Sequence, residues 1–563
     1  EKPAFLLKEN KNITLLNLEG KKIQDIEIIP KDYKDLLILS GDGVENKIYN
    51  LLNIFSVGTA ISENIKEASF KIKALKKKNK KIIHCHGVFD VIHLGHINHF
   101  KKAKSLGDIL IVTVTADEFV NKGPNRPIFP LDIRMELLAN LEFIDLVCPN
   151  HSQSAVPAIN KLKSDIYCKG KDYKNNSSDI SGQIKLEKKA VNSFGGKIFY
   201  TDDEILSSSK IINRSGLKLN IAQKNYLDLV TKKIKNKSDI FNMIESYKNL
   251  KVLVIGESII DEYTKSEALG KSGKEPILVL RDLSSNKFLG GALAISNNVA
   301  SLSNNVSLLS YIGEKKEFLP FIKKKLNKKI VTNFIFKKNA KTILKKRFID
   351  HVNNQKVFGV YSIDDQNLSR SEEKIFQSKL KKKIKQHDIV IVSDYGHGLI
   401  SKKTAKIIIQ NSKFVAVNAQ LNAANIGHHT ISMYKNADLV IINENEMRHE
   451  LRNKVDDIDM LIKDLSKKLN SKHTVVTSGS EGAKVFNKNN IVKCPAFGTK
   501  VIDKVGTGDS MLIILALSLY EKNNIYFSML LASLAAAQNV QFMANSKSIN
   551  RLSLIKSIQS YLK

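Results

Sequence analysis

The stretch that decides the fold is Lys81–Asp117, which reads KIIHCHGVFDVIHLGHINHFKKAKSLGDILIVTVTAD. An apolar run at its start leads into a turn at Gly87, and helical spacing follows over residues 92–107. A second apolar run begins directly afterwards, at Ile109. This order predicts a strand, a loop, a helix and a parallel strand, the start of an α/β domain.

Two histidines at the start of the predicted helix indicate chemistry on a nucleotide. His93 and His96 lie three residues apart, so both imidazoles are expected on one face at the positive end of the helix. When an α-phosphate is attacked, charge builds on its oxygens, and imidazoles and N–H donors stabilise it. Gly95 lets the backbone approach the phosphates. An isolated HxxH is an ordinary helix start, but this one follows a strand and GVFD, which favours a nucleotidyl-transfer site.

From this motif onward the sequence resembles the cytidylyltransferase-like nucleotidyltransferases, and further motifs of that family follow in order. By this resemblance His93 and His96 stabilise the transition state, and Asp90 faces the phosphate or sugar of the acceptor. The residues expected to line the nucleotide site are Gly87, Val88 and Phe89. The residues expected to hold phosphates are Lys122, Arg134, Lys169, Ser207, Ser208 and Ser209.

The chain carries a formal net charge of +33 over 563 residues, with 89 Lys and Arg against 56 Asp and Glu. Such a charge suggests nucleic-acid binding, but the lysines are spread along the whole chain. Runs such as Lys76–Lys81 and Lys381–Lys385 contain no aromatic residues among the lysines. We therefore predict solvated lysine faces and no specific nucleic-acid partner.

The four cysteines, Cys85, Cys148, Cys168 and Cys494, are far apart in the sequence and form no CxxC pair. This spacing disfavours a disulfide framework or a zinc site and fits a reducing cytoplasm. The longest apolar stretches, such as Met511–Tyr520, are too short to cross a bilayer. We expect a cytoplasmic protein with no membrane partner.

The motifs divide the chain into four parts. Short alternating apolar runs in residues 1–60 predict a small β-rich segment of unknown role. Residues 61–214 are the predicted nucleotidyltransferase domain. Residues 215–249 are polar and helical in pattern, with neither Pro nor a long Gly/Ser tract, which predicts a helical connector. A second α/β domain is expected over residues 250–563.

The second chemical centre lies near the end of the chain, where DKVGTGD (503–509) precedes the apolar helix Met511–Tyr520. Gly506–Gly508 would expose backbone N–H groups at a helix N-terminus, which makes an anion hole for a transferring phosphoryl group. Asp509 beside this hole can take the proton of an attacking hydroxyl. A GxGD alone is also a common tight turn, so its neighbours decide the interpretation.

Those neighbours resemble the ribokinase-like (PfkB) sugar kinases over residues 251–563, which implies a second doubly wound, Rossmann-like α/β domain. By this resemblance Asp509 is the catalytic base, and Asn443 and Glu446 of an NxxE motif organise magnesium indirectly and hold the triphosphate. Other expected nucleotide-binding residues are Ser478, Gly479, Gly482, Gly506, Thr507 and Gly508. The expected sugar-binding residues are Asp261, Gly290, Gly291 and Asp394.

Three positions on the sugar side depart from the family pattern. Ala294 stands where a GGxxNxA pattern has Asn, Glu257 replaces a frequent Asp, and His397 stands where heptose kinases often have Lys. Thr507 in place of Ala in GAGD is a mild change. The phosphoryl-transfer motifs are intact, so these departures concern the identity of the acceptor.

A sugar kinase joined to a nucleotidyltransferase can catalyse two consecutive steps of one pathway. The pair resembles the bifunctional heptose enzymes, which phosphorylate heptose 7-phosphate at the anomeric position and then adenylylate the product to ADP-heptose for cell-surface glycans such as lipopolysaccharide. In those enzymes the kinase comes first, whereas here it comes second. The resemblance implies a sugar phosphate and ATP as substrates, with ATP or CTP for the transferase, and Mg²⁺ in both steps. It also allows a homodimer through the kinase domain.

Two other functions stay open on the sequence. The kinase domain could be a degenerate sugar-binding module attached to a single active nucleotidyltransferase. Alternatively, the transferase could use CTP with a small alcohol phosphate. The retained Asp509 and NxxE motif weigh against the first reading, and the attached sugar kinase weighs against the second.

Overall fold

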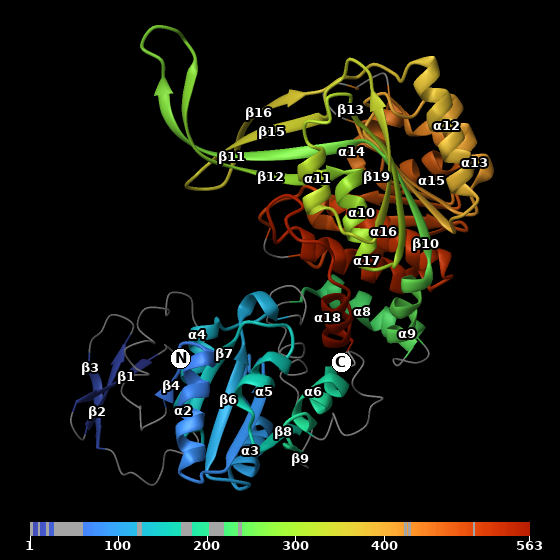
Figure 1. The fold of residues 1–563 in the computed structure, drawn as a ribbon. Coiled ribbons are helices and arrows are strands. Elements are labelled where there is room, and N and C mark those ends of the chain that lie inside the picture. The colour runs from blue at the N-terminus through green and yellow to red at the C-terminus, as the bar shows by residue number, and fades with distance from the viewer. Residues whose placement is uncertain are drawn as a thin grey trace. The chain divides into compact units, whose positions relative to one another are not determined.

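The chain forms two compact units, Glu1–Val120 with Arg126–Ile211 (unit 1) and Ile212–Lys563 (unit 2) (Figure 1). The structure is a computed structural model. It describes residues 4–9, 12–17, 22–27, 60–120, 126–170, 183–201, 219–234, 239–421, 425, 429–498 and 501–562.

Unit 1 begins with a small antiparallel sheet in which β2 pairs with both neighbours. The sheet confirms the predicted β-rich segment. Its strands are β1 (Ala4–Glu9), β2 (Asn12–Asn17) and β3 (Lys22–Glu27).

The main sheet of unit 1 has six parallel strands in the order β4-β7-β6-β5-β8-β9. Both apolar runs of the opening motif are strands of this sheet, side by side, as predicted. The strands are β4 (Ala60–Ile61), β5 (Ile82–Gly87), β6 (Ile109–Thr115), β7 (Leu146–Asn150), β8 (Ile166–Gly170) and β9 (Lys197–Thr201).

Helices cover both faces of this sheet, because alternate strand residues are apolar on both sides. Ile83 and Cys85 of β5 belong to a core with Phe100 of α3, whereas Ile82 packs in a second core with Ile72 of α2. The helices are α2 (Ile65–Lys77), α3 (Leu94–Lys104), α4 (Leu131–Ala139), α5 (Val156–Leu162) and α6 (Gln183–Asn192), with the 3-10 turn η1 (Asp117–Phe119).

Unit 2 is built on a nine-stranded sheet in the order β14-β13-β10-β17-β18-β19-β20-β21-β22, of which the last two strands are antiparallel to their neighbours. The predicted apolar runs are its central strands. The strands are β10 (Lys251–Gly256), β13 (Asn305–Gly313), β14 (Ile330–Lys337), β17 (Ile389–Asp394), β18 (Val415–Ala419), β19 (Leu439–Asn443), β20 (His473–Thr477), β21 (Ala483–Asn487) and β22 (Asn490–Cys494).

Helices also cover both faces of the large sheet. α12–α15 lie on one face, and α10 and α16 lie on the other. The predicted connector contains α8 and α9, and α8 packs on α17 of the same unit. The helices are α8 (Ile221–Lys233), α9 (Asp239–Ser246), α10 (Ala292–Ala300), α11 (Leu319–Lys325), α12 (Arg370–Ile384), α13 (Lys402–Asn411), α14 (Glu444–Leu451), α15 (Ile458–Leu469), α16 (Thr507–Tyr520), α17 (Ile525–Asn539) and α18 (Arg551–Tyr561).

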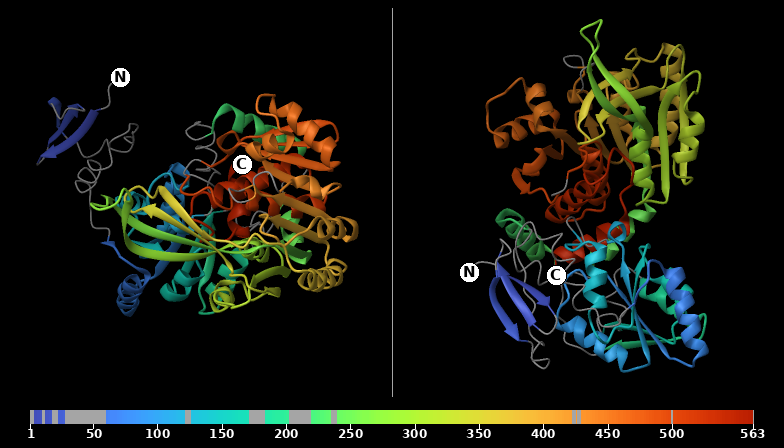
Figure 2. Two further views of the ribbon diagram at one scale, coloured as in Figure 1. Left: turned by 90° about the horizontal axis from the view of Figure 1, so that it is seen from above. Right: turned by 90° about the vertical axis from the view of Figure 1, so that its left-hand side faces the viewer.

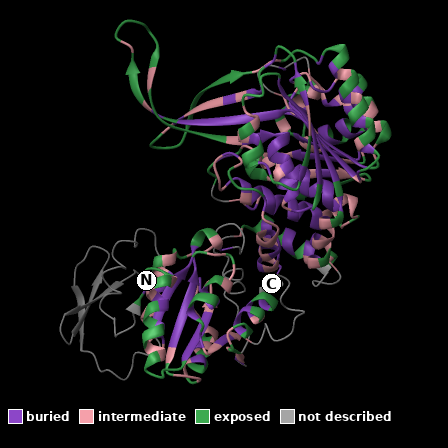
Figure 3. Ribbon diagram, viewed as in Figure 1, coloured by how far each residue is buried: buried purple, intermediate pink, exposed green. Residues whose placement is uncertain are grey.

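A second sheet in unit 2, with the order β12-β11-β15-β16, is not predicted by the sequence patterns. Its hairpin of β11 and β12 stands out from the rest of the unit (Figure 2), and the far part of that hairpin is largely exposed (Figure 3). Strands that face water on both sides lack the apolar pattern that identifies a strand. The strands are β11 (Ser258–Lys271), β12 (Leu278–Gly291), β15 (Ile343–Asp350) and β16 (Lys356–Ser362).

Each main sheet has a point where the strand order reverses. β5 lies between β6 and β8 in unit 1, and β10 lies between β13 and β17 in unit 2. Ligands of open parallel sheets bind at the carboxyl ends of the strands at such points. Within the described ranges, none of the helices has the length and apolar character needed to span a membrane.

Candidate active sites

The two histidines of the HxGH motif lie against each other at the switch point of unit 1. β5 ends at Gly87, and α3 begins at Leu94 with His93 as its N-cap residue. The ring centroids of His93 and His96 are 3.9 Å apart, with an angle of 22° between the ring planes. Both imidazoles therefore lie at the positive end of α3, where a helix stabilises phosphate charge.

The loop between β5 and α3 is shaped by Phe89. Its φ is 51°, which is uncommon for a residue other than glycine. The Phe89 ring lies 5.4 Å from the His96 ring and 5.0 Å from the Phe100 ring. A Cβ on Gly87 would come within 2.8 Å of the Phe89 ring, so this approach requires glycine. The predicted nucleotide-lining residues thus form one packed turn beside the histidines.

Arg134 is placed differently from the prediction of a direct phosphate contact. Its side chain has no exposed surface. The guanidinium donates hydrogen bonds to the backbone oxygens of Val88, Thr115 and Phe129 and to the carboxylate of Asp117. Since all three of its nitrogens are engaged by the protein, Arg134 holds the predicted nucleotide-lining turn at Val88 in place in this structure.

Asp90 is also turned into the protein. Its Oδ1 accepts hydrogen bonds from the N–H groups of Ile128, at 2.5 Å, and Phe129, at 3.1 Å, and its Oδ2 lies 3.4 Å from a guanidinium nitrogen of Arg126. The carboxylate therefore fixes the segment that follows residue 125. Its predicted contact with the acceptor stays a prediction.

Lys169 lies at the carboxyl end of β8, the strand next to β5. Its ammonium group is 3.1 Å from the carboxylate of Glu187, which also accepts a hydrogen bond from the hydroxyl of Tyr167 at 3.2 Å. Glu187 lies on α6 and was not identified from the sequence, because no motif marks it. The remaining predicted phosphate ligands, Lys122, Ser207, Ser208 and Ser209, lie outside the described residues.

In unit 2 the GTGD motif starts α16, a helix of 14 residues. Gly506 is its N-cap residue with a φ of 81°, and a Cβ there would lie 2.3 Å from Oδ1 of Asn545. A Cβ on Gly508 would have no neighbour within 4 Å, so the space above the helix start is open. This geometry opens the N-terminus of α16 to an anion, although the N–H of Thr507 itself donates to the backbone oxygen of Lys504 at 3.4 Å.

Asp509 lies in the first turn of α16, beside this opening. Burial raises the pKa of its carboxyl group to about 6, the charge of Asp261 acts in the same direction, and a hydrogen bond from Tyr395 opposes the rise. The Tyr395 hydroxyl is 3.3 Å from Oδ2 of Asp509. A carboxylate with such a pKa suits a general base at neutral pH. Tyr395 was not singled out from the sequence, although it directly follows the polar end of a predicted strand.

The loop that follows β17 is held by two buried carboxylates. Glu257 accepts hydrogen bonds from the N–H groups of Tyr395, at 3.0 Å, and His397, at 3.1 Å. Asp394 accepts a hydrogen bond from the hydroxyl of Tyr434 at 2.5 Å, and burial raises the pKa of Asp394 to about 6. Asp394 thus shapes the turn in this structure, and its predicted contact with the sugar stays a prediction.

The predicted sugar-side residues come together at the base of the smaller sheet. Arg347 of β15 donates a hydrogen bond to Oδ1 of Asp261, and a Cβ on Gly290 would lie 2.2 Å from Oδ2 of the same carboxylate. Gly291 has a φ of 55°, and a Cβ there would lie 2.5 Å from the backbone oxygen of Glu257. Both glycines are therefore required, Gly290 by its close approach to the carboxylate of Asp261 and Gly291 by its close approach to the backbone of Glu257.

The NxxE motif forms a capping box at the start of α14. The side chain of Asn443 accepts a hydrogen bond from the N–H of Glu446 at 2.8 Å, and Glu446 accepts one from the N–H of Asn443 at 3.0 Å. The other carboxylate oxygen of Glu446 accepts from the N–H of Leu421 at 3.1 Å. Burial raises the pKa of Glu446 above its ordinary value. Both residues lie at the carboxyl end of β19, on the predicted nucleotide side.

The predicted nucleotide loop follows β20. The hydroxyl of Ser478 donates a hydrogen bond to the carboxylate of Glu444 at 3.0 Å, and the Ser478 N–H donates one to the oxygen of Gly482 at 2.8 Å. Gly479 and Gly482 have φ values of 57° and 92°, and a Cβ on Gly482 would lie 2.2 Å from the oxygen of Cys494. The loop is therefore a tight turn that requires glycine at position 482 and favours it at position 479.

Asp503 is a buried carboxylate that the sequence patterns did not identify. It accepts hydrogen bonds from Lys356 at 2.7 Å, from the Tyr263 hydroxyl at 2.8 Å, and from the N–H groups of Ala544, at 2.9 Å, and Val505, at 3.2 Å. Burial alone would raise the pKa of Asp503, but these donors lower it below its ordinary value. Asp503 thus connects strands of the smaller sheet to the segment that leads into the anion hole.

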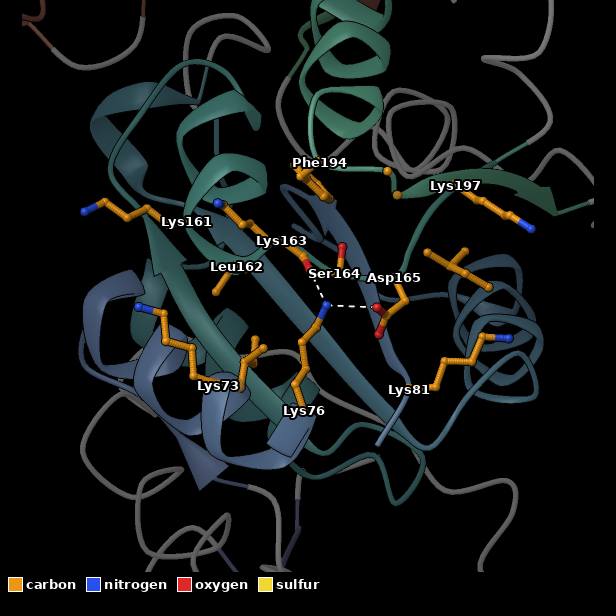
Figure 4. Close-up of a pocket in the computed structure, with 14 residues that line it drawn as sticks. Lys73, Lys76, Lys81, Lys161, Leu162, Lys163, Ser164, Asp165, Phe194 and Lys197 are labelled. Atoms are coloured by element: carbon orange, nitrogen blue, oxygen red, sulfur yellow. Dashed lines mark hydrogen bonds and ion pairs between the residues drawn. The ribbon is translucent and has the colours of Figure 1, made fainter. Parts of the chain in front are cut away.

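A pocket of about 460 Å³ lies at the other end of unit 1, where β5, β8 and β9 begin (Figure 4). Lys76 reaches between Asp165, at 2.8 Å, and the backbone oxygen of Lys163, at 2.7 Å. Several of the lysines lie at or near helix C-termini, where they balance the helix dipoles. The pocket is remote from the histidine pair. Its lysines are Lys73, Lys76, Lys81, Lys161, Lys163 and Lys197.

Comparison with known families agrees with this geometry. Residues 249–549, more than half of the chain, match the family described as pfkB family carbohydrate kinase. The chain belongs to the pfkB family. Residues 84–214 match the family described as cytidylyltransferase-like. The pfkB kinase domain therefore follows a nucleotidyltransferase domain, in the order that the motifs predicted.

Curated relatives of this pfkB-family chain include proteins named Bifunctional protein HldE. The one from Campylobacter jejuni (strain RM1221) is 28% identical over 294 residues, which are 51% of this chain and 60% of that protein. The one from Helicobacter acinonychis (strain Sheeba) is 31% identical over 314 residues, 54% of this chain and 66% of that protein. The chain thus spans about 60% of the length of the first of these relatives.

Among solved structures, phosphofructokinase-2 from Escherichia coli in complex with potassium matches 56% of this chain and 99% of its own chain, with 14% identity and a TM-score of 0.46.

Proposed function

We propose that the protein is a bifunctional sugar-activating enzyme. Unit 2 transfers a phosphoryl group from ATP to the anomeric hydroxyl of a heptose phosphate. Unit 1 then transfers a nucleoside monophosphate, which we propose to be AMP from ATP, to the resulting sugar 1-phosphate and releases pyrophosphate. The product would be ADP-heptose, a precursor of cell-surface glycans such as lipopolysaccharide. The main observation behind this proposal is that one chain contains both arrangements. These are the stacked His93 and His96 in unit 1 and, in unit 2, Asp509 beside the anion hole at the start of α16.

In the kinase step Asp509 accepts the proton of the attacking hydroxyl, since its pKa of about 6 leaves it ionised at neutral pH. The N–H groups of Gly506–Gly508 stabilise the charge on the transferring phosphoryl group. Asp261 orients the sugar, and Arg347 holds that carboxylate in place. The nucleotide lies against the turn at Ser478 and the capping box at Asn443.

In the transferase step His93 and His96 stabilise the charge that develops on the α-phosphate and the departing pyrophosphate. The ring of Phe89 keeps His96 in position, because it packs against one edge of that imidazole. Lys169 at the neighbouring strand end supplies a further positive charge for the triphosphate.

Magnesium would neutralise the triphosphate in both steps. Over the ranges that the structure describes, no three His, Cys, Asp or Glu side chains converge as a metal site. Asn443 and Glu446 are already engaged in the capping box. We therefore propose that the metal enters with the triphosphate and that these two residues act on it only indirectly.

The assignment of heptose draws on the resemblance to the bifunctional heptose enzymes and on the relatives named Bifunctional protein HldE. All four cysteines are free and buried, which supports the proposed cytoplasmic location. A homodimer through the kinase domain stays a prediction.

The deciding experiment is a matrix assay of the purified full chain with Mg²⁺, with ATP, CTP or GTP, and with a panel of heptose and hexose phosphates. ADP and pyrophosphate are measured separately. Release of ADP and then pyrophosphate with heptose 7-phosphate and ATP supports the proposal. Pyrophosphate release only from preformed sugar 1-phosphates, with no ADP from any acceptor, would overturn the kinase half.

A further inference from the structure

Lys345 of β15 is a buried cation that forms no ion pair with an acidic side chain among the described residues. In the described part of the chain three Lys or Arg residues are buried as a whole, Arg134, Lys337 and Lys345. Arg134 is paired with Asp117 at 2.5 Å, and Lys337 lies 3.4 Å from Asp364. Lys345 is 7% exposed and has no hydrogen bond or ion pair with any described residue.

A buried ammonium group without a partner is unfavourable, because it has lost its hydration and gained no opposite charge in direct contact. Burial accordingly lowers the pKa of Lys345 below its ordinary value, while the charge of Asp261 acts against that change. Asp261 cannot serve as a full partner, because its carboxylate is bound to Arg347. None of the described residues therefore supplies the negative charge that would complete this position.

The surroundings of Lys345 place it on the sugar side of the kinase site. It is the register partner of Asp261 on the neighbouring strand, so both side chains lie on one face of the smaller sheet. Its ammonium nitrogen is 5.3 Å from the ring centroid of Tyr395 and 5.9 Å from that of Tyr361. The hydroxyl of the same Tyr395 donates a hydrogen bond to the base, Asp509.

We propose that Lys345 binds the phosphate group that the acceptor sugar already carries. The inference rests on the proposed kinase function and names the residue that selects a phosphorylated acceptor. The transferring phosphoryl group has its own donors at Gly506–Gly508, and the smaller sheet carries Asp261, which belongs to the sugar. A neutral sugar would leave the ammonium group of Lys345 buried and unpaired, whereas a phosphate would form a charge-assisted hydrogen bond with it.

The test compares three variants of the full chain. Lys345→Gln removes the charge with little change in length, and Lys345→Arg keeps the charge. Lys346→Gln is the matched control, because Lys346 is the adjacent residue on the opposite face of the strand and is paired with Glu262 at 3.4 Å. Circular dichroism confirms that each variant is folded. Kinetics of ADP release are measured with heptose 7-phosphate and with the unphosphorylated heptose, and binding of heptose 7-phosphate is measured by calorimetry without nucleotide.

For Lys345→Gln we expect the KM and the Kd for heptose 7-phosphate to rise about 10- to 100-fold, the range for loss of a charge-assisted hydrogen bond. The KM for ATP should change less than about twofold, and the preference for the phosphorylated sugar should fall by the same factor as the affinity. Lys345→Arg should recover most of the affinity, and Lys346→Gln should behave as the wild type.

Three outcomes overturn the inference. The first is a Lys345→Gln variant with unchanged affinity for heptose 7-phosphate. The second is a variant in which only kcat or the KM for ATP changes, which would place Lys345 at the transferring phosphate. The third is a wild-type protein that phosphorylates only unphosphorylated sugars, which keeps the kinase function and removes the role of Lys345. If the wild-type protein forms no ADP with any acceptor, the kinase proposal fails, and the calorimetric comparison still decides whether Lys345 binds the sugar phosphate.

Discussion

The hydroxyl of Tyr395 donates a hydrogen bond to Oδ2 of Asp509 across 3.3 Å. The two residues come from different elements, the loop after β17 and the first turn of α16. Glu257 fixes Tyr395 from behind by accepting its backbone N–H. The candidate base is therefore positioned by the switch point of the large sheet, where a ligand is expected.

The first prediction is that the two activities can be removed independently. Asp509→Asn should lower ADP formation by about 100- to 10,000-fold, because the variant cannot accept the proton of the attacking hydroxyl. His96→Ala should lower pyrophosphate release from a preformed sugar 1-phosphate by a similar factor. Each variant serves as the control for the other in paired assays of the same preparation. Loss of both activities from either single change would contradict two separate sites.

The second prediction concerns the pH dependence of the kinase. Since burial raises the pKa of Asp509 to about 6 and the base must be ionised, kcat/KM for the acceptor should fall about tenfold per pH unit below this value. Tyr395→Phe removes a hydrogen bond that lowers this pKa, so the acid limb should move to higher pH. Rates are measured between about pH 5 and 9. If the acid limb of the Tyr395→Phe profile does not move, the group that titrates in the kinase reaction is not Asp509.

The strands and the two catalytic motifs could be predicted from the sequence because their signals are local. Apolar runs that end in glycine turns identified β5, β10 and their neighbours, and the predicted helix at Met511 is the body of α16. The stacking of His93 on His96 follows from their spacing on one helix. The fold of two α/β units is therefore confirmed.

The roles of single side chains could not be predicted in the same way, because their partners are remote in the sequence. Arg134 fits a phosphate-binding residue by its place in the motif series, yet its partners include Val88 and Thr115, on other elements of unit 1. Lys345 lies in a strand that has no clear apolar pattern. Only the tertiary fold shows that it is buried beside Tyr395 and that no described acidic side chain forms an ion pair with it.

The third prediction tests Arg134 as a positioning residue. Arg134→Lys replaces a guanidinium that serves four acceptors with a single nitrogen, so backbone oxygens among those of Val88, Thr115 and Phe129 lose their partner, and that of Thr115 is buried. We expect a loss of about 2–4 kcal/mol in unfolding free energy and a lower kcat for pyrophosphate release. Scanning calorimetry of the full chain follows the stability. Lys71→Gln, which breaks the surface pair with Glu67, is the control and should leave the unfolding temperature unchanged.

The fourth prediction concerns the approach of Gly290 to Asp261. A methyl group at position 290 would lie 2.2 Å from Oδ2 of Asp261, and that carboxylate has little freedom to move because Arg347 holds its other oxygen. Gly290→Ala should therefore displace Asp261 and raise the KM for the acceptor sugar by about tenfold or more, in line with an overpacking cost of about 1–3 kcal/mol. The KM for ATP should stay within about twofold of the wild type. Gly273→Ala is the matched control, because a Cβ at that position has no neighbour within 4 Å and the residue lies in the turn between β11 and β12. An acceptor KM that is unchanged in Gly290→Ala, or raised equally in Gly273→Ala, would show that Asp261 does not hold the sugar in the way proposed.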